Sequence, residues 1–155
     1  MLQPGHGHHR AVEVALLLYT GYNVAATLVS VPAGQIGDRH SLTAVLALGV
    51  SAFAAAYAGL AWAGPSIGLL LALFVIAGVG IGCVETAEHA VVATYASSDV
   101  RGSAFGVLAA VQSAGNLAAS RCALEPRLAK AAFLYLTGWM LMALLLLARS
   151  RRGAR

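Results

Sequence analysis

The protein is a chain of 155 residues, of which 59% are hydrophobic and 10% are charged. Soluble domains average about 45–50% apolar and about 25% charged residues, so this composition excludes an ordinary water-soluble domain and favours a lipid bilayer as the environment. The formal net charge of +4 is not arranged as a basic stripe with interleaved aromatic residues, so nucleic acid is not an expected partner.

Five apolar segments follow one another, and each is long enough to cross a membrane, because about 20 helical residues span the hydrocarbon core. We therefore predict an all-α, polytopic membrane helix bundle with five transmembrane helices. The predicted organisation is a flexible tail at 1–10, a transmembrane domain at 11–148 and a basic cytoplasmic tail at 149–155. The five spans are expected at residues 11–34, 42–63, 67–96, 102–120 and 131–148.

The first apolar segment is too long for a secretory signal peptide, and it carries Glu13 and Asn23, so it is predicted to be a span. His6, His8 and His9 precede it. A metal site is one reading of these histidines and a weakly chelating tail is the other. No second cluster completes a coordination shell, so no metal ion or cofactor is predicted.

A short polar joint between the first two segments has the pattern of a tight cytoplasmic hairpin. Gly34 lies four residues before the pair Asp38-Arg39. Pro32 lacks a backbone N–H and crowds the preceding turn, so we expect the first helix to end or bend near Gly34. A cytoplasmic hairpin places six of the ten basic residues inside and, with five spans, the N-terminus outside.

Glycines in the third segment predict close helix packing. Gly78 and Gly82 form a Gly-x-x-x-Gly pattern around Gly80, which lets a neighbouring backbone approach. A glycine-rich nucleotide loop would require a preceding strand, and none is predicted.

Three ionisable residues follow in the same segment. Glu85, Glu88 and His89 are spaced i, i+3 and i+4, so they share one helix face. An acidic side chain at the bilayer centre costs about 2.5–3.5 kcal/mol on insertion scales, so these groups should face a cavity or a partner. Proton relay or substrate contact is one interpretation. The alternative is that the cluster lies near cytoplasmic water, where Glu85 and His89 pair.

Uncharged polar residues in the first and fourth segments have two readings as well. They line the same cavity, or they act as hydrogen-bonding contacts between helices, each contributing roughly 0.6 kcal/mol. The candidates are Tyr19, Tyr22, Asn23, Gln112 and Asn116.

Enzymatic activity is not expected. Residues 85–89 place Glu where a zinc protease of the His-x-x-Glu-His type has its first histidine. No catalytic residue is therefore predicted.

Several motifs resemble major facilitator superfamily transporters. Leu-Tyr-Thr-Gly-Tyr-Asn at 18–23, continuing through Pro-Ala-Gly and Gly-Asp-Arg within 32–39, is similar to their eighth helix and the loop after it. Residues 85–93 and Arg-Gly-Ser-Ala-Phe-Gly at 101–106 resemble the tenth helix and the entry to the eleventh, and residues 132–135 resemble the twelfth. The motifs occur in the family's order.

The resemblance implies a partial transporter half, equivalent to the eighth to twelfth helices, with the first seven absent. The expected activity is secondary transport of an unidentified small solute by alternating access, coupled to protons, in the cell inner membrane. Glu85, Glu88 and His89 are then expected to serve coupling or gating. The expected cytoplasmic loop motif comprises Gly34, Asp38, Arg39, Arg101 and Gly102.

Two departures from the family pattern leave an alternative function open. Ser41, Leu42 and Thr43 replace a glycine and two basic residues of the family loop, and charged residues within 121–130 interrupt an apolar helix, as an external loop or a local frameshift would. The alternative is a non-transporting membrane interaction protein that pairs with another transporter chain. A separate N-terminal transporter half is the expected protein partner, beside the lipid bilayer.

Overall fold

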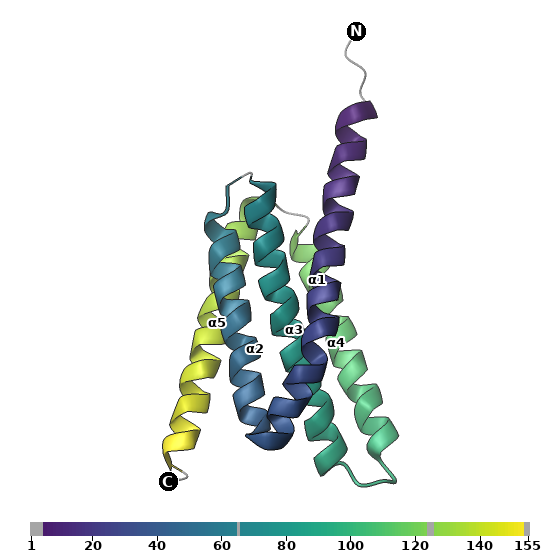
Figure 1. The fold of residues 1–155 in the computed structure, drawn as a ribbon, viewed down its shortest axis with the longest axis vertical. Helices are drawn as coiled ribbons and strands as arrows, with labels where there is room; N and C mark the ends of the chain where they lie inside the picture. Colours follow the sequence, from purple (N-terminus) through teal and green to yellow (C-terminus); the bar gives the residue numbers. More distant parts are fainter. Residues whose placement is uncertain (1–4, 65, 124–125, 154–155) are drawn as a thin grey trace.

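The computed structural model describes residues 5–64, 66–123 and 126–153, with side chains described for 9–64, 66–117, 131–145 and 149. Over these residues the chain forms five α-helices and no strand (Figure 1). This confirms the predicted all-α helix bundle. The helices are α1 (Gly5–Arg39), α2 (Leu42–Trp62), α3 (Ile67–Tyr95), α4 (Arg101–Ala123) and α5 (Pro126–Gly153).

Helix α1 is longer at both ends than the sequence suggested. It begins at Gly5, six residues before the predicted start of the span, and it continues through Pro32 to Arg39. The helix was expected to end or bend near Gly34. It does not end there, and Figure 1 shows that its lower part bends towards α2. At about 1.5 Å per residue, its 35 residues rise about 52 Å, more than the ~30 Å hydrocarbon core. Its N-terminal part projects beyond the other helices (Figure 1).

The hairpin between α1 and α2 is correspondingly short. The His40 amide donates to the Ile36 carbonyl oxygen at 2.9 Å, which closes the last turn of α1. Ser41 is the N-cap of α2, and its Oγ accepts a hydrogen bond from the Ala44 amide at 3.1 Å. A Cβ added at Gly37 would lie 3.1 Å from Leu42 Cδ2, so the glycine allows the two helices to turn tightly.

Glycines in α3 let its neighbours approach closely, as the Gly-x-x-x-Gly pattern predicted. A methyl group at Gly78 would overlap the Tyr22 carbonyl oxygen of α1, and one at Gly82 would lie 2.6 Å from the Ala26 carbonyl oxygen. On another side of α3, a Cβ at Gly80 would lie 3.1 Å from the Gly49 carbonyl oxygen of α2. Backbone contacts therefore fix α3 against both α1 and α2.

Three of the described helices are long and apolar enough to cross a membrane, by length and composition: the stretches His9–Arg39, Leu42–Trp62 and Ile67–Tyr95. The described apolar stretch in α5, Ala131–Leu145, is shorter. That α4 and α5 also cross the bilayer remains a prediction. The charged segment 121–130 is divided between the end of α4 and the start of α5, and its side chains and residues 124–125 lie outside the described part.

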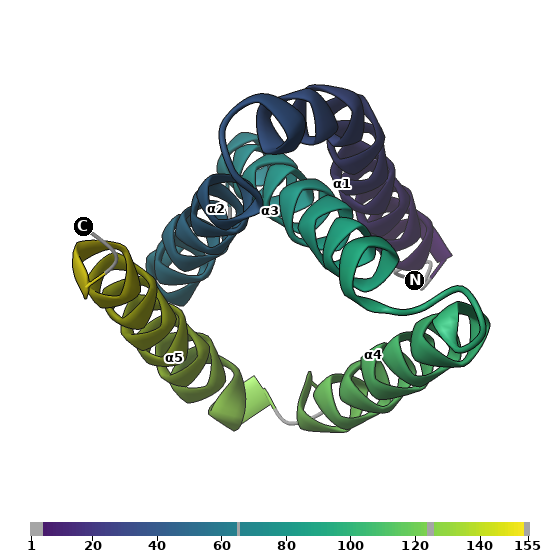
Figure 2. The same cartoon turned by 90° about the horizontal axis from the view of Figure 1, so that it is seen from below.

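Helix α3 lies at the centre of the arrangement, packed against α1 and α2, while α5 packs on α2. Helix α4 makes fewer contacts, with α3 and α5, and Figure 2 shows α4 and α5 approaching each other at one end, away from α1. The best-buried cluster joins α1, α2 and α3 and consists of Ala33, Val45, Cys83 and Ala87. This cluster supports the residues that follow on α3.

Candidate functional site

The C-terminal part of α3 carries the ionisable residues predicted to be functional. Glu85 and His89 are exposed and Glu88 is half-buried. His89 Nδ1 lies 2.7 Å from the Glu85 carbonyl oxygen, which can only accept, so Nδ1 donates this bond. His89 therefore bonds to the backbone of Glu85 and leaves the Glu85 carboxylate available for other contacts.

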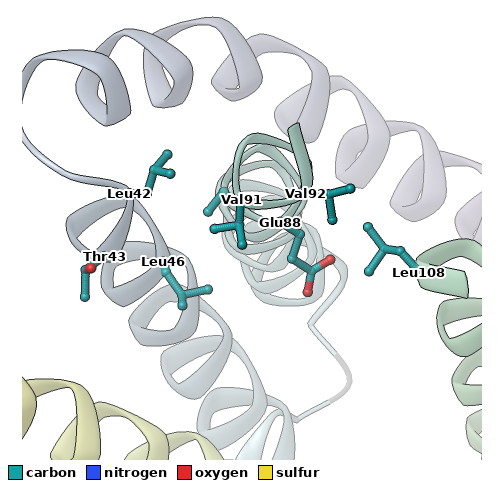
Figure 3. A pocket seen from close by; sticks show the side chains of 8 residues that line it. Leu42, Thr43, Leu46, Glu88, Val91, Val92 and Leu108 are labelled. Carbon is teal, nitrogen blue, oxygen red and sulfur yellow. The ribbon is translucent and has the colours of Figure 1, made fainter. Parts of the chain in front are cut away.

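Glu88 joins α3 to α4. Gln112 Nε2 of α4 donates a hydrogen bond of 2.9 Å to Glu88 Oε2. The carboxylate lies at a cavity of about 420 Å³, and Figure 3 shows it projecting between Leu46 of α2 and Leu108 of α4. The cavity is lined by Leu42, Thr43, Leu46, Ala87, Glu88, Val91, Val92 and Leu108. We call it the carboxylate cavity.

A ring contact reinforces the connection between α3 and α4. The imidazole of His89 stacks on Phe105, with ring centroids 5.6 Å apart and planes 25° apart. Phe105, Leu108 and Gln112 are spaced i, i+3 and i+7, so one face of α4 supplies all three. Adjacent residues of α3 thus hold one face of a helix that otherwise contacts little of the described chain.

The carboxylate cavity lies towards the end of the molecule where α1 meets α2. Leu42, Thr43 and Leu46 belong to the first turns of α2, which begins directly after the hairpin. Glu88 is seven residues from the last residue of α3, about 10 Å along the helix axis. A group at this depth is reached by water from the hairpin side more readily than one at the bilayer centre.

Comparison with known protein families decides the class of protein to which this arrangement belongs. The model of the Major Facilitator Superfamily matches residues 5–154. The chain belongs to the major facilitator superfamily. No curated protein and no solved structure matches it. Proteins of this superfamily are membrane transporters and not enzymes, so the chain is an integral, multi-pass membrane protein of the transporter class.

Of the polar residues predicted to line a cavity of this major facilitator protein, some lie at a cavity and others do not. Gln112 bonds Glu88 across two helices, and Tyr22 lines a second, aromatic cavity. Asn23 Nδ2 instead donates to the Tyr19 carbonyl oxygen of its own helix at 2.8 Å, and the Tyr19 side chain is 65% exposed. Asn116 is exposed on α4. Neither Tyr19 nor Asn23 lines the two cavities.

The predicted loop motif lies at the same end of the molecule as the carboxylate cavity. Asp38 and Arg39 are exposed in the last turn of α1, where the cation of Arg39 suits the negative end of the helix dipole. Arg101 Nη2 donates to the carbonyl oxygen of Ala96, the C-cap of α3, at 3.4 Å. Gly102 has no atom within 4 Å of an added Cβ. These residues form the helix ends around the two turns.

Gly34 packs loosely, since an added Cβ would lie 3.9 Å from Thr86 Cγ2. Among the residues whose side chains are described, no group of three or more His, Cys, Asp or Glu is arranged to hold a metal ion.

Sequence reasoning missed the aromatic cavity and the apolar wall of the carboxylate cavity. Leu42 and Thr43 depart from the loop sequence of the family, and the structure shows that both line the carboxylate cavity. Phe53 and Tyr57 lie four residues apart in α2, a spacing that places both rings on one face, and this was the available signal.

Proposed function

We propose that this chain takes part in the proton-coupled transport of a small solute by alternating access, with Glu88 as the coupling carboxylate. It would act with an N-terminal transporter half, in the same or a separate polypeptide, in an inner membrane that carries a proton gradient. The observation that supports this most directly is the hydrogen bond from Gln112 to Glu88 at the edge of the carboxylate cavity.

An ionisable group in a spanning helix is costly, which favours a functional reading of Glu88. Inserting such a group at the bilayer centre costs about 2.5–3.5 kcal/mol on insertion scales. The half-buried Glu88 carboxylate faces a cavity and accepts a bond from an amide. A group in this position exchanges protons with water in the cavity while it remains attached to a neighbouring helix.

Proton binding at Glu88 would change how α4 is held. A hydrogen bond to an ionised acceptor is roughly twice as strong as one between neutral groups, so protonation weakens the Gln112 bond. Helix α4 has few other contacts with the described chain, so this bond and the His89–Phe105 stack carry much of its attachment to α3. Protonation therefore favours a movement of α4 that opens or closes the carboxylate cavity.

The neighbouring residues have supporting roles in this proposal. His89 contacts Phe105 of α4 directly, so it takes part in gating. Glu85 is exposed one turn before His89, where it passes protons between Glu88 and water.

The proposal is tested by reconstituting the chain in proteoliposomes, alone and with a co-expressed N-terminal half. A panel of radiolabelled sugars, amino acids, organic cations and organic anions is offered with and without a proton gradient. We expect one solute class to accumulate against its gradient when the proton gradient is imposed. Glu88→Gln, which keeps an acceptor for Gln112, should retain solute exchange between the two sides but lose accumulation.

Asn116→Ala is the matched control on α4, since Asn116 lies outside the carboxylate cavity, and it should accumulate solute like the wild type. Proton-driven accumulation by Glu88→Gln at the wild-type level would refute the coupling role. Absence of flux in every arrangement, together with tight co-purification with the N-terminal half, would instead favour a non-transporting interaction protein.

A further inference from the structure

A second cavity, of about 220 Å³, lies where α1, α2, α3 and α5 meet. It is smaller than the ~300–1,000 Å³ of sites for drug-sized ligands, so it suits a compact chemical group. Five of its seven lining residues are aromatic. The lining consists of Tyr22, Phe53, Tyr57, Leu60, Phe74, Ala77 and Phe133. We call it the aromatic cavity.

Neighbouring rings of the aromatic cavity are tilted against one another. Phe53 and Tyr57 have ring centroids 5.6 Å apart with planes at 37°, and Tyr57 and Phe133 have centroids 5.7 Å apart with planes at 42°. Rings tilted in this way leave part of each face uncovered by the neighbouring ring. Ring faces carry negative electrostatic potential, so several faces around one space attract a cation.

The ionisable side chains that follow the aromatic cavity on α3 include two carboxylates. No Lys or Arg is among its lining residues. Phe74 and Glu85 on α3 are 11 positions apart, about three helical turns, so they share a face, and the same spacing relates Ala77 to Glu88. Two carboxylates therefore follow the aromatic cavity along one side of α3.

We propose that the aromatic cavity binds the quaternary ammonium group of the transported solute. A quaternary ammonium cannot donate hydrogen bonds, so aromatic rings can recognise it without a hydrogen-bond acceptor. The proposal rests on the proposed transport function, because it names the substrate class. The aromatic rings that line the cavity are half-buried, so the cavity is accessible. The carboxylates on α3 balance the charge of the cation as the solute moves towards the carboxylate cavity.

Equilibrium binding of radiolabelled choline to the chain in nanodiscs tests the proposal. The nanodiscs contain phosphatidylglycerol and phosphatidylethanolamine, which carry no choline group. The matched probe is 3,3-dimethyl-1-butanol, a neutral carbon isostere of choline, used as a competitor. We expect choline to bind at least tenfold more tightly than the isostere. Equal affinity of the two compounds, or no choline binding, would overturn the proposal.

Two aromatic residues on α5 provide matched variants. Phe133→Leu removes a ring from the cavity, whereas Tyr135→Leu removes a ring that is 65% exposed and outside the cavity. Phe133→Leu should weaken choline binding at least tenfold and Tyr135→Leu should leave it unchanged. Tyr57→Phe keeps the aromatic ring and removes the hydroxyl, and its affinity for choline should stay within threefold of the wild type. This variant distinguishes recognition by aromatic rings from recognition by the hydroxyl. A wild-type affinity in a correctly folded Phe133→Leu would also overturn the proposal.

The same chemistry occurs in a lipid headgroup, so a second arm adds phosphatidylcholine to the nanodiscs. If phosphatidylcholine lowers the binding of free choline, and does not do so in Phe133→Leu, the cavity accepts the lipid headgroup. If phosphatidylcholine leaves choline binding unchanged, the cavity is assigned to soluble solutes. Both results support quaternary ammonium recognition. Choline binding is measured without a proton gradient. The inference on choline therefore stands even if the flux assay shows no proton coupling. Proton-driven accumulation of another solute, without choline binding, overturns the inference alone.

Discussion

At the scale of single residues, the contact between Glu88 and Gln112 is expected to contribute more to transport than to stability. Interhelical hydrogen bonds in membrane proteins average about 0.6 kcal/mol, with a maximum of about 1.7. We predict that a double-mutant cycle of Glu88→Ala and Gln112→Ala gives a coupling energy of about 0.6 kcal/mol. It is measured from unfolding in mixed micelles with increasing sodium dodecyl sulfate.

A matched cycle uses Ser51, whose hydroxyl donates to the Ala47 carbonyl oxygen of its own helix at 2.7 Å. Ser51→Ala combined with Gln112→Ala should show no coupling, because α2 and α4 make no contact over the residues that the structure describes. A coupling energy of zero between Glu88 and Gln112 would contradict the contact that the structure shows.

The sequence identified both partners of this contact but not the contact itself. Glu88 and Gln112 were conspicuous as polar residues in apolar segments, and each was predicted to face a cavity or another helix. Their pairing depends on the rotation and tilt of α4 against α3, which a single sequence does not encode locally. The aromatic cavity was missed for a related reason, since Phe and Tyr in a spanning helix are equally suited to packing.

At the scale of elements, backbone contacts at glycine hold α3 against α1. We predict that Gly82→Ala lowers the free energy of unfolding by about 1–3 kcal/mol, the usual range for overpacking, because its Cβ would lie 2.6 Å from the Ala26 carbonyl oxygen. Gly115→Ala on α4 is the matched control, since nothing lies within 4 Å of its added Cβ. It should be neutral or slightly stabilising, as alanine favours helix. Unfolding followed by circular dichroism measures both, and equal effects would argue against the α1–α3 contact.

The start of α2 gives a second prediction for an element. Ser41→Ala removes the acceptor of the 3.1 Å bond from the Ala44 amide, and loss of an N-cap typically costs about 1 kcal/mol. Ser66→Ala at the start of α3 removes a longer bond, of 3.5 Å to the Leu69 amide, and should cost less. Thermal unfolding in detergent measures the pair. A larger loss from Ser66→Ala would reverse the order that the bond lengths predict.

The bounds of α2 and α3 could be predicted from the lengths of the apolar segments, because few polar residues interrupt these segments. The first and last residues of both helices lie within one residue of the predicted bounds. The ends of α1 could not be predicted in this way. Pro32 removes one N–H and crowds one turn, but a long helix packed against α3 tolerates that loss and bends. The polar Gly-His segment before Ala11 extends the helix beyond the apolar run for which hydropathy is informative.

At the scale of the whole molecule, the positions of the turns predict the topology. Figure 1 shows the α1–α2 hairpin, the α3–α4 turn and the C-terminal end of α5 at one end of the molecule, and Arg39, Arg101 and Arg149 belong to this end. Basic residues near helix ends favour the cytoplasmic side. We therefore predict that this end is cytoplasmic and that the α2–α3 turn and the start of α5 lie on the opposite side.

Single cysteines test this topology in a chain that also carries Cys83→Ser and Cys122→Ser. A membrane-impermeant maleimide should label His40→Cys and Ser98→Cys only from the cytoplasmic side, and Gly64→Cys and Ala131→Cys only from the other side. Since α2 has 21 residues and rises about 31 Å, it is long enough to separate His40 from Gly64 across the core. Labelling of Ser98→Cys and Ala131→Cys from the same side would show that α4 does not cross the bilayer. The carboxylate cavity would then lack a wall that spans the membrane, and alternating access through a movement of α4 would be untenable.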